Sequence, residues 1–349
     1  MAGPWYLKAV VSRFVCLVAL ILLAHGPVFM GCPERSRSRA WPGLGIESTA
    51  QDVLKHFDAD LRGRTAIVTG AQTGLGLETC KALASVGCRV LLCCLEPDVG
   101  AAAARRDIMT EDPNPCADFE VLGLDLADFS SVEQCAAQIL IQESSVDLLV
   151  LNAGVCGIQG QTQQGFEIQM GVNHIGHALF CRLLLPKMTS QTFTSRIIVV
   201  ASHGHKHGIL DPNENDLQCT YTRFFGWGSY LHSKLANIVY AKALHSALKA
   251  SGVCNVIVSS LSPGAVASGI WSATCNKVPF FRSLLPFLCD RDLQHGAATV
   301  LFCCLAPECG DFEHGGSYFE NCNFAETSSA ASDVHLQRAL WKATNDIFE

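Results

Sequence analysis

Tyr230 and Lys234 are the residues whose types and spacing point most directly to chemistry. They are four positions apart in a segment expected to be helical, so their side chains lie on one helix face. A free tyrosine has a pKa of about 10 and is a poor acid at neutral pH, whereas a nearby ammonium group favours the phenolate and lowers that pKa. The pair is therefore a candidate for general acid–base catalysis. The ordinary alternative is a tyrosine on an amphipathic helix beside a solvated lysine.

Ser202 is a second candidate, because it ends the apolar segment 196–202. Open α/β sheets bind ligands outside the carboxyl ends of their strands, where the hydroxyl group of Ser202 would hold a substrate oxygen. A serine that caps the following turn is the alternative interpretation.

Three histidines, His203, His205 and His207, alternate directly after Ser202. Alternate residues of an extended segment share a face, which is the argument for a metal site. No carboxylate or cysteine completes a metal-ligand pattern, however. We therefore expect a polar loop beside the site and no metal.

A glycine-rich loop follows the first apolar segment, Thr65–Thr69. Gly70 would permit a tight turn, Gly74 a close approach of the backbone to a pyrophosphate, and Gly76 close packing of helix on strand. The phosphate would then lie at the helix N-terminus, where free N–H groups attract anions. A turn without a ligand is the alternative, but the position after the first strand of a βαβ unit favours nucleotide binding.

The elements that would position these residues alternate regularly after residue 60. Continuously apolar strands separated by helices are typical of a parallel sheet with helices on both faces. We therefore predict an α/β fold with a Rossmann-type, doubly wound parallel sheet of about seven strands. The predicted strands are Thr65–Thr69, Arg89–Cys94, 119–125, 147–152, 196–202, Val256–Ser262 and 317–321, and the predicted helices include 75–86, 130–141 and 166–187.

The composition excludes several classes of protein. The chain has 349 residues, 49% of them hydrophobic, and a net charge of −7. It is therefore neither disordered nor a basic nucleic-acid binder, and we expect no nucleic-acid partner. Its 18 cysteines fall in apolar runs, where cysteine behaves as a small hydrophobic residue. We interpret most of them as buried thiols in a reducing compartment; a secreted disulfide protein is the alternative, which thiol titration would test.

The first thirty residues differ from the rest of the chain. Residues 14–24 are uncharged and apolar, and the segment 9–30 is long enough to cross a bilayer. We interpret residues 1–30 as a membrane anchor, residues 31–59 as a linker and residues 60–349 as the folded domain. The anchor, the expected thiols and the absence of a glycosylation acceptor predict the endoplasmic reticulum membrane, with the folded domain in the cytosol. A cleaved signal peptide, leading to the secretory lumen or to secretion, is the alternative.

The motifs occur in the order found in the short-chain dehydrogenase/reductase superfamily, which residues 60–345 resemble. Among its branches, the retinol-dehydrogenase-like proteins are the most similar, through VNHIGHALF (172–180), YLHSKLANIVYAKAL (230–244) and LSPGAV (261–266). The tail segments QHGAATVLFCCLAPE and GGSYFENC resemble the dehydrogenase domain of WW-domain-containing oxidoreductases, although no WW domain precedes it here. The ordered motifs are TGAQTGLG (69–76), Asp125-Leu126, Asn152-Ala153-Gly154, Asn173, Ser202, Tyr230-x-x-Ser233-Lys234 and Pro263-Gly264.

This resemblance implies an oxidoreductase that uses NAD or NADP to interconvert an alcohol and a carbonyl. It implies that Tyr230 transfers the proton at the substrate oxygen, that Ser202 holds this oxygen, and that Lys234 also holds the nicotinamide ribose. Asn173 would keep a water near the lysine. The implied cofactor-binding residues are Gly70, Gln72, Thr73, Gly74, Leu75, Gly76, Asp125, Leu126, Asn152, Ala153, Gly154, Tyr230, Lys234, Pro263 and Gly264.

The resemblance also implies a lipophilic substrate, such as a retinoid, a steroid, a prenol or a fatty aldehyde. The apolar stretch 278–288 is a candidate lid over that substrate, with an ordinary buried helix as the alternative. The identity of the substrate does not follow from the sequence, and homodimer formation is left open.

The sequence departs from its relatives where the cofactor would be selected. Their segment Leu-Ala-Cys-Arg is here Leu92-Cys93-Cys94-Leu95, so Leu95 replaces an arginine that would accept the 2′-phosphate of NADP. Cys94 is neutral, and Glu96 would repel a phosphate if it turned inward. We therefore expect weak discrimination, with NAD at least as good as NADP.

A non-catalytic nucleotide-binding or signalling module on the same fold is the main rival interpretation. The presence of Ser202, Tyr230 and Lys234 together speaks against it. Turnover of any carbonyl compound with a nicotinamide cofactor would separate the two interpretations.

Overall fold

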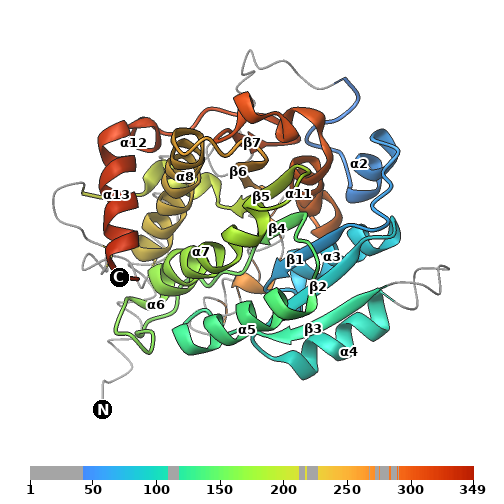
Figure 1. Ribbon diagram of the computed structural model, residues 1–349, viewed down its shortest axis with the longest axis horizontal. Coiled ribbons are helices and arrows are strands. Elements are labelled where there is room, and N and C mark those ends of the chain that lie inside the picture. Colours follow the sequence, from blue (N-terminus) through green and yellow to red (C-terminus); the bar gives the residue numbers. More distant parts are fainter. Residues whose placement is uncertain are drawn as a thin grey trace.

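A computed structural model describes residues 42–108, 118–211, 217, 227–266, 268–271, 275, 283, 289 and 291–349. An eight-stranded sheet runs through its centre in the order β3-β2-β1-β4-β5-β6-β7-β8 (Figure 1). The strands β1 to β7 pair in parallel, and β8 pairs antiparallel with β7. The strands are β1 Thr65–Thr69, β2 Arg89–Cys94, β3 Phe119–Gly123, β4 Leu148–Leu151, β5 Ser195–Val200, β6 Val256–Ser262, β7 Tyr318–Glu320 and β8 Asn323–Phe324.

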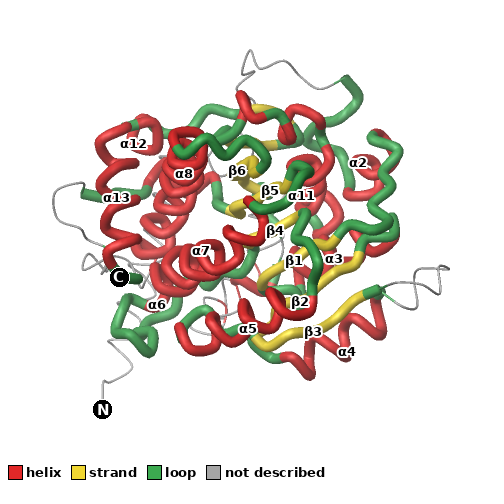
Figure 2. The backbone as a smooth tube through the Cα atoms, in the orientation of Figure 1, coloured by secondary structure: helices red, strands yellow, loops and turns green. Residues whose placement is uncertain are grey.

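Helices cover both faces of this sheet (Figure 2). One face packs against α2, α3, α4 and α11, and the opposite face against α5, α7, α8 and α13. The helices are α2 Ala50–His56, α3 Gly74–Ser85, α4 Pro97–Asp107, α5 Phe129–Gln142, α6 Ile168–Met170, α7 Gly176–Thr189, α8 Trp227–Ala250, α11 Leu293–Leu305, α12 Ser329–Ser332 and α13 Val334–Asp346.

The alternation of side chains along each strand produces the two cores. In β1, Ile67 belongs to the core under α5, α7 and α8, whereas its neighbours Ala66 and Val68 belong to the core under α3 and α11. All three are fully buried. Because both faces are covered, the central strands β1 and β4 are apolar and wholly buried, as expected for a parallel sheet, whereas β3 at the edge is mostly half-buried. The predicted doubly wound fold is confirmed.

An additional short strand, β8, was not expected from the sequence. It follows β7 through Asn321 and Cys322, which both have φ angles of 55°. Positive φ at two successive central residues is the geometry of a tight hairpin turn. The turn adds an antiparallel edge to an otherwise parallel sheet, and only Asn321 has a side chain that commonly tolerates this conformation.

Residues 42–59 are not the linker that the sequence suggested. Thr49 begins α2 with a capping box, in which its side chain and that of Asp52 bond each other's backbone N–H groups. Val53 and Leu54 are buried, and α2 packs against α11. The amphipathic pattern of α2 is only two turns long. The proline and glycine residues before it therefore led to the prediction of a linker. The described core therefore begins before Asp60.

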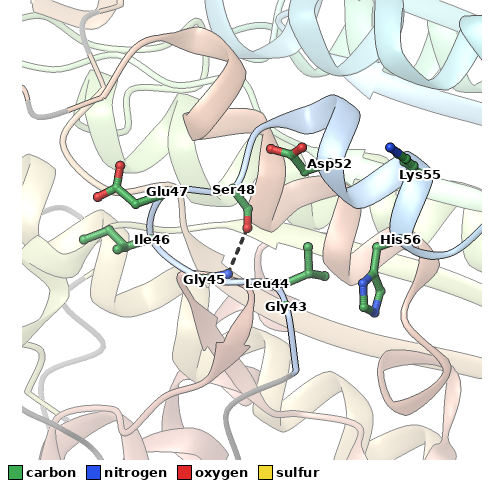
Figure 3. Close-up of a pocket in the computed structure, with 9 residues that line it drawn as sticks. All are labelled: Gly43, Leu44, Gly45, Ile46, Glu47, Ser48, Asp52, Lys55 and His56. Carbon is green, nitrogen blue, oxygen red and sulfur yellow. Dashed lines mark hydrogen bonds between the residues drawn. The ribbon is translucent and has the colours of Figure 1, made fainter.

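The proposed anchor at 1–30 lies outside the described residues. Among the helices of the described ranges, none combines the length and the apolarity needed to cross a bilayer. A surface pocket beside α2 is lined by residues 43–48 together with Asp52, Lys55 and His56 (Figure 3). None of the candidate site residues lines it.

Candidate active site

The candidate residues come together where the strand order reverses. From β1 the chain builds outward to β2 and β3, and then returns to the other side of β1 with β4. Such a switch point leaves a crevice outside the carboxyl ends of the strands. Gly70 follows β1, Asn152 follows β4, Ser202 follows β5 and Pro263 follows β6, so the four loops share one edge of the sheet.

The glycine-rich loop is shaped by very close backbone contacts. Gly70 has a φ angle of 66°, and a Cβ atom there would lie 2.8 Å from the Cα atom of Ala153. A Cβ atom on Gly76 would lie 2.5 Å from the carbonyl oxygen of Gly70 and 2.6 Å from Nδ2 of Asn152. Because real Cβ atoms do not approach so closely, both positions require glycine.

The start of α3 fits a dinucleotide pyrophosphate. Thr73 is the N-cap, but its side chain makes no capping hydrogen bond. Oε1 of Gln72 is buried without a hydrogen-bond partner in the same loop. The first N–H groups of a helix attract anions when no side chain caps them. Gly74 and Leu75, the first residues of α3, would present these groups.

The wall beside this loop is built by Thr69 at the end of β1. Its Oγ1 accepts the N–H groups of Asn152 (2.9 Å) and Ala153 (3.0 Å). Nδ2 of Asn152 donates to the carbonyl oxygen of Thr69 at 2.9 Å. With both lone pairs of Oγ1 in use, its hydrogen points to Nε2 of His177, 2.8 Å away. His177 was missed in the sequence, where its spacing of four residues from Asn173 was the available signal.

Asn173 lies in a π-helix, Gly171–Ile175, between α6 and α7. The single helix predicted over 166–187 is therefore interrupted. Oδ1 of Asn173 accepts the N–H group of Val155 at 2.8 Å, and Nδ2 donates to the Val155 carbonyl (3.0 Å) and to Oγ of Ser233 (2.9 Å). The side chain thus ties the loop after β4 to α8.

Gly154 separates Asn173 from Lys234. A Cβ atom at Gly154 would lie 3.3 Å from Oδ1 of Asn173 and 3.5 Å from Nζ of Lys234. The Asn-Ala-Gly segment therefore reaches between the two polar side chains, and glycine leaves them the room to approach it.

Lys234 is a buried cation. Its side chain enters from α8, and Nζ donates to the carbonyl oxygen of Val200 at 3.0 Å. The residue is 2% exposed, and this burial lowers the pKa of Lys234 to about 8. The ammonium group is therefore still largely charged at neutral pH, next to the end of β5.

Burial raises the pKa of the Tyr230 hydroxyl well above its usual value. The side chain of Ser202 lies near enough to that of Tyr230 to lower the pKa of the tyrosine hydroxyl, but by less than burial raises it. The expectation that the ammonium group of Lys234 lowers this pKa is therefore wrong for this structure. The reason is geometric: Nζ is bonded to Val200 and lies 5.7 Å from the centroid of the Tyr230 ring, so it does not offset the loss of solvent.

Asp125 and Leu126 follow β3 at the same edge. Oδ1 of Asp125 accepts the N–H group of Ala127 at 2.8 Å, which shapes the turn before α5. A Cβ atom on Gly176 would lie 2.3 Å from the carbonyl oxygen of Leu126, so α7 packs directly on this turn. The side chain of Asp125 is partly used by its own turn.

Pro263 and Gly264 are held by a residue that the sequence did not single out. Nη1 of Arg291 donates to the Pro263 carbonyl at 3.2 Å, and Nη2 bonds Oδ1 of Asn321. Gly264 has a φ angle of 85°, and a Cβ atom there would lie 2.7 Å from the Arg291 guanidinium group. No sequence signal distinguishes Arg291, because its partners are far away in the chain.

The three alternating histidines do not form a shared face. They lie in a 3₁₀-helix, His203–His207, capped by Ser202, rather than in an extended segment. Among the residues that the structure describes, no three His, Cys, Asp or Glu side chains are placed to hold a metal ion. Nδ1 of His203 pairs with Glu320 at 3.1 Å, whereas His205 is wholly buried.

The connection between β2 and α4 contains the residues expected to select the cofactor. Cys94 is buried against α4, where a Cβ atom on Gly100 would lie 2.5 Å from its sulfur. Leu95 is 58% exposed, and Glu96 is also exposed. Cys94 therefore packs into the core, and Leu95 occupies the accessible position. The candidate lid 278–288 lies, apart from residue 283, outside the described residues.

Known proteins are similar to this chain in both sequence and fold. Residues 64–211 match the short chain dehydrogenase family. The chain is 38% identical over 292 residues to retinol dehydrogenase 11 of Mus musculus, covering 83% of this chain and 88% of that protein. It is 34% identical over 309 residues to the WW domain-containing oxidoreductase of Drosophila melanogaster, covering 86% and 71%. A solved structure of an uncharacterized protein from Mycobacterium paratuberculosis is 28% identical and covers 86% of this chain and 96% of that one, with a TM-score of 0.65.

Proposed function

Because the chain belongs to the short-chain dehydrogenase/reductase family, in its retinol-dehydrogenase-like branch, we propose that this oxidoreductase interconverts a lipophilic alcohol and the corresponding carbonyl compound with a nicotinamide cofactor. The single observation that carries the proposal is the placement of Ser202 and Tyr230 together beside the buried ammonium group of Lys234. A lipophilic substrate is supported by the relatives named retinol dehydrogenases.

The cofactor would be held by the loops at the switch point. The glycine-rich loop and the uncapped N-terminus of α3 fit its pyrophosphate. Asn152, Ala153 and Gly154 form the wall under it, and the loop of Pro263 and Gly264 closes the other side. When bound, the cofactor supplies the hydride donor or acceptor.

The protein's own part is to hold the substrate oxygen and to move a proton to or from it. The hydroxyl group of Ser202 holds the carbonyl oxygen. Tyr230 is protonated at neutral pH, so its hydroxyl group is the proton donor to that oxygen during reduction, although its raised pKa makes it a weaker acid than a solvated tyrosine. In the oxidation direction Tyr230 receives the proton of the alcohol. The ammonium group of Lys234 would hold the nicotinamide ribose of the bound cofactor, as the family resemblance implies.

Replacement of the tyrosine oxygen tests the proposal. Tyr230→Phe should fold and bind NADH but lose turnover of retinal or a long-chain aldehyde by on the order of 10²–10⁴-fold, the usual contribution of general acid–base catalysis. Absorbance of NADH or NADPH would be followed with the full chain. Tyr240→Phe is the matched control, because Tyr240 lies on the same helix in the core, stacked on Trp341.

Two results would contradict the proposed function. If the unaltered chain turns over no carbonyl compound with either cofactor although it binds them, the non-catalytic module is the better interpretation. If Tyr230→Phe keeps more than about a third of the turnover, well above the expected loss, Tyr230 is not the acid.

A further inference from the structure

We propose that His205 is a positioning residue for Ser202: its neutral imidazole ring fixes the peptide group that follows the serine and thereby holds the hydroxyl group toward Tyr230. The inference rests on the proposed function, since it assigns a task at the same site. His205 itself is too far inside the protein to meet a substrate, because its exposed fraction is 0%.

The geometry around His205 is a bridge between two distant segments. Its Nδ1 atom lies 2.8 Å from the carbonyl oxygen of Ser202, and its backbone N–H donates to the same oxygen at 3.1 Å. On the other side of the ring, Nε2 accepts the N–H group of Ser328 at 3.2 Å. The ring also meets the edge of the Tyr318 ring, with centroids 5.0 Å apart.

The tautomer of His205 follows from these partners. The backbone N–H of Ser328 is a donor, so Nε2 must be the ring's acceptor. The proton therefore lies on Nδ1 and points to a carbonyl oxygen, which accepts it. Burial lowers the pKa of His205 to about 4, so the ring keeps this neutral form at physiological pH.

The peptide group between Ser202 and His203 is consequently held from both edges. His205 binds its carbonyl oxygen, and Oγ of Ser262 accepts its N–H group at 3.0 Å. The same Ser262 oxygen accepts the N–H group of Gly264 at 3.3 Å. A fixed peptide plane sets the direction of the Cα–Cβ bond of Ser202, whose hydroxyl group already accepts the N–H group of Gly204 at 3.1 Å.

Precise placement of this hydroxyl group matters for the rate. A displacement of about 1 Å at a positioning group can lower a rate by roughly a hundredfold. Without the Nδ1–H donor, the peptide group keeps only the backbone bond to the Ser202 carbonyl oxygen and the bond from the His203 N–H to Ser262, so its plane is held less firmly.

Two amide variants test the hydrogen bonds at the two ends of the ring separately. In His205→Asn the side-chain amide replaces the Nδ1–H donor to Ser202 but does not reach Ser328. In His205→Gln the longer side chain places its amide oxygen where Nε2 accepts the Ser328 N–H, and the donor to Ser202 is lost. We expect kcat within about threefold of the unaltered enzyme for His205→Asn and roughly ten- to a hundredfold lower for His205→Gln, with KM changed by less than about twofold in both.

A control variant accounts for the general cost of removing a buried histidine bond. Nε2 of His245 is 3.0 Å from the carbonyl oxygen of Phe312, at the far end of α8. His245→Asn removes this bond and should lower the urea concentration at half-unfolding while kcat stays unchanged.

The tautomer is measurable without any turnover. Nitrogen NMR of the imidazole rings, with the His205 signals identified by their loss in His205→Asn, should show the proton on Nδ1 near neutral pH. A proton on Nε2 would overturn the proposed role even if His205→Gln does not fold.

The kinetic outcomes distinguish this role from the proposed function. Equal kcat values for the Asn and Gln variants, in an enzyme that otherwise turns over its substrate, would overturn the role of His205 alone. Absence of turnover in the unaltered chain would overturn the proposed function and, with it, this role.

Discussion

Lys234 is the residue at which function and stability oppose each other. Its pKa is lowered by burial from 10.5 to about 8, so the folded state binds the lysine proton less tightly than the unfolded state does. Between these two pH values the unfolded chain holds more protons, and the free energy of unfolding therefore rises with pH across this window. Below about pH 8 the full penalty of roughly 3 kcal/mol is present.

We predict that Lys234→Met stabilises the fold and abolishes turnover. Removing the buried charge should increase the free energy of unfolding near neutral pH by about 2 kcal/mol, after the loss of one hydrogen bond is subtracted. The Val200 carbonyl keeps Nδ2 of Asn237 at 3.3 Å. Urea unfolding at about pH 7 and about pH 10 measures the effect, which should shrink at the higher pH. A variant less stable than the unaltered chain near neutral pH would contradict the argument.

Single residues of the site were predictable where the sequence itself contains the geometric reason. Tyr230 and Lys234 share a helix face, and Gly70 and Gly76 stand where only glycine fits. The pKa of Tyr230 was not predictable, because it depends on burial by segments distant in the chain. Arg291 escaped notice for the same reason, since its contacts are long-range.

At the scale of elements, the β2–α4 connection is where we expect the adenosine end of the cofactor to meet the charges that select it. Leu95 is its accessible residue, while Cys94 is packed into the core. We predict that Leu95→Arg shifts the preference toward NADP by roughly 1.5–3 kcal/mol, the contribution of one hydrogen bond to a charged group. Side-by-side titrations of NADH and NADPH measure this shift.

Val99→Arg is the matched control for this variant. Val99 lies four residues further along the chain, in the first turn of α4, and is 44% exposed, so the substitution adds the same charge nearby. It should change the preference much less. A preference for NADP above about a hundredfold in the unaltered chain, a difference of about 2.7 kcal/mol, would mean that other residues select the cofactor.

The seven parallel strands were predictable because most of them are rich in apolar residues, and β1, β2 and β6 have the predicted bounds. The interruption of the helix at Gly171–Ile175 was not, because hydrophobic spacing does not distinguish a π-helix from its α-helical flanks. α2 was missed because its apolar face consists of only a few residues, and its stability comes from packing on α11.

For the whole molecule, the distribution of thiols follows from the two buried cores. Most of the cysteines in the described part of the chain are free thiols and are buried. Burial raises the pKa of Cys181 and of Cys304 to about 12 in each case, so these thiols are unreactive near neutral pH. The expectation of buried thiols is confirmed for these residues, while the reducing compartment and the membrane anchor stay predictions.

Three buried histidines should dominate the response of the whole fold to acid. Burial lowers the pKa of His174 to about 3 and those of His177 and His205 to about 4. In the unfolded chain they titrate near the ordinary value of about 6.5, so between about pH 6.5 and pH 4 the unfolded state binds more protons and stability falls as the pH falls. Carboxylates with lowered pKa values, such as Asp52 and Asp292, contribute only below this window.

We therefore predict that the free energy of unfolding decreases steeply as the pH falls below about 6.5. Where all three rings are protonated in the unfolded chain but neutral in the folded protein, the slope should approach about 4 kcal/mol per pH unit. Urea unfolding at closely spaced pH values measures this slope. His174→Phe removes one titrating ring and should reduce the slope by about a third, although it also loses the bond to Thr344 and so lowers stability near neutral pH. A free energy of unfolding that stays constant between about pH 7 and pH 4.5 would show that these rings bind protons as readily in the folded protein as in the unfolded chain.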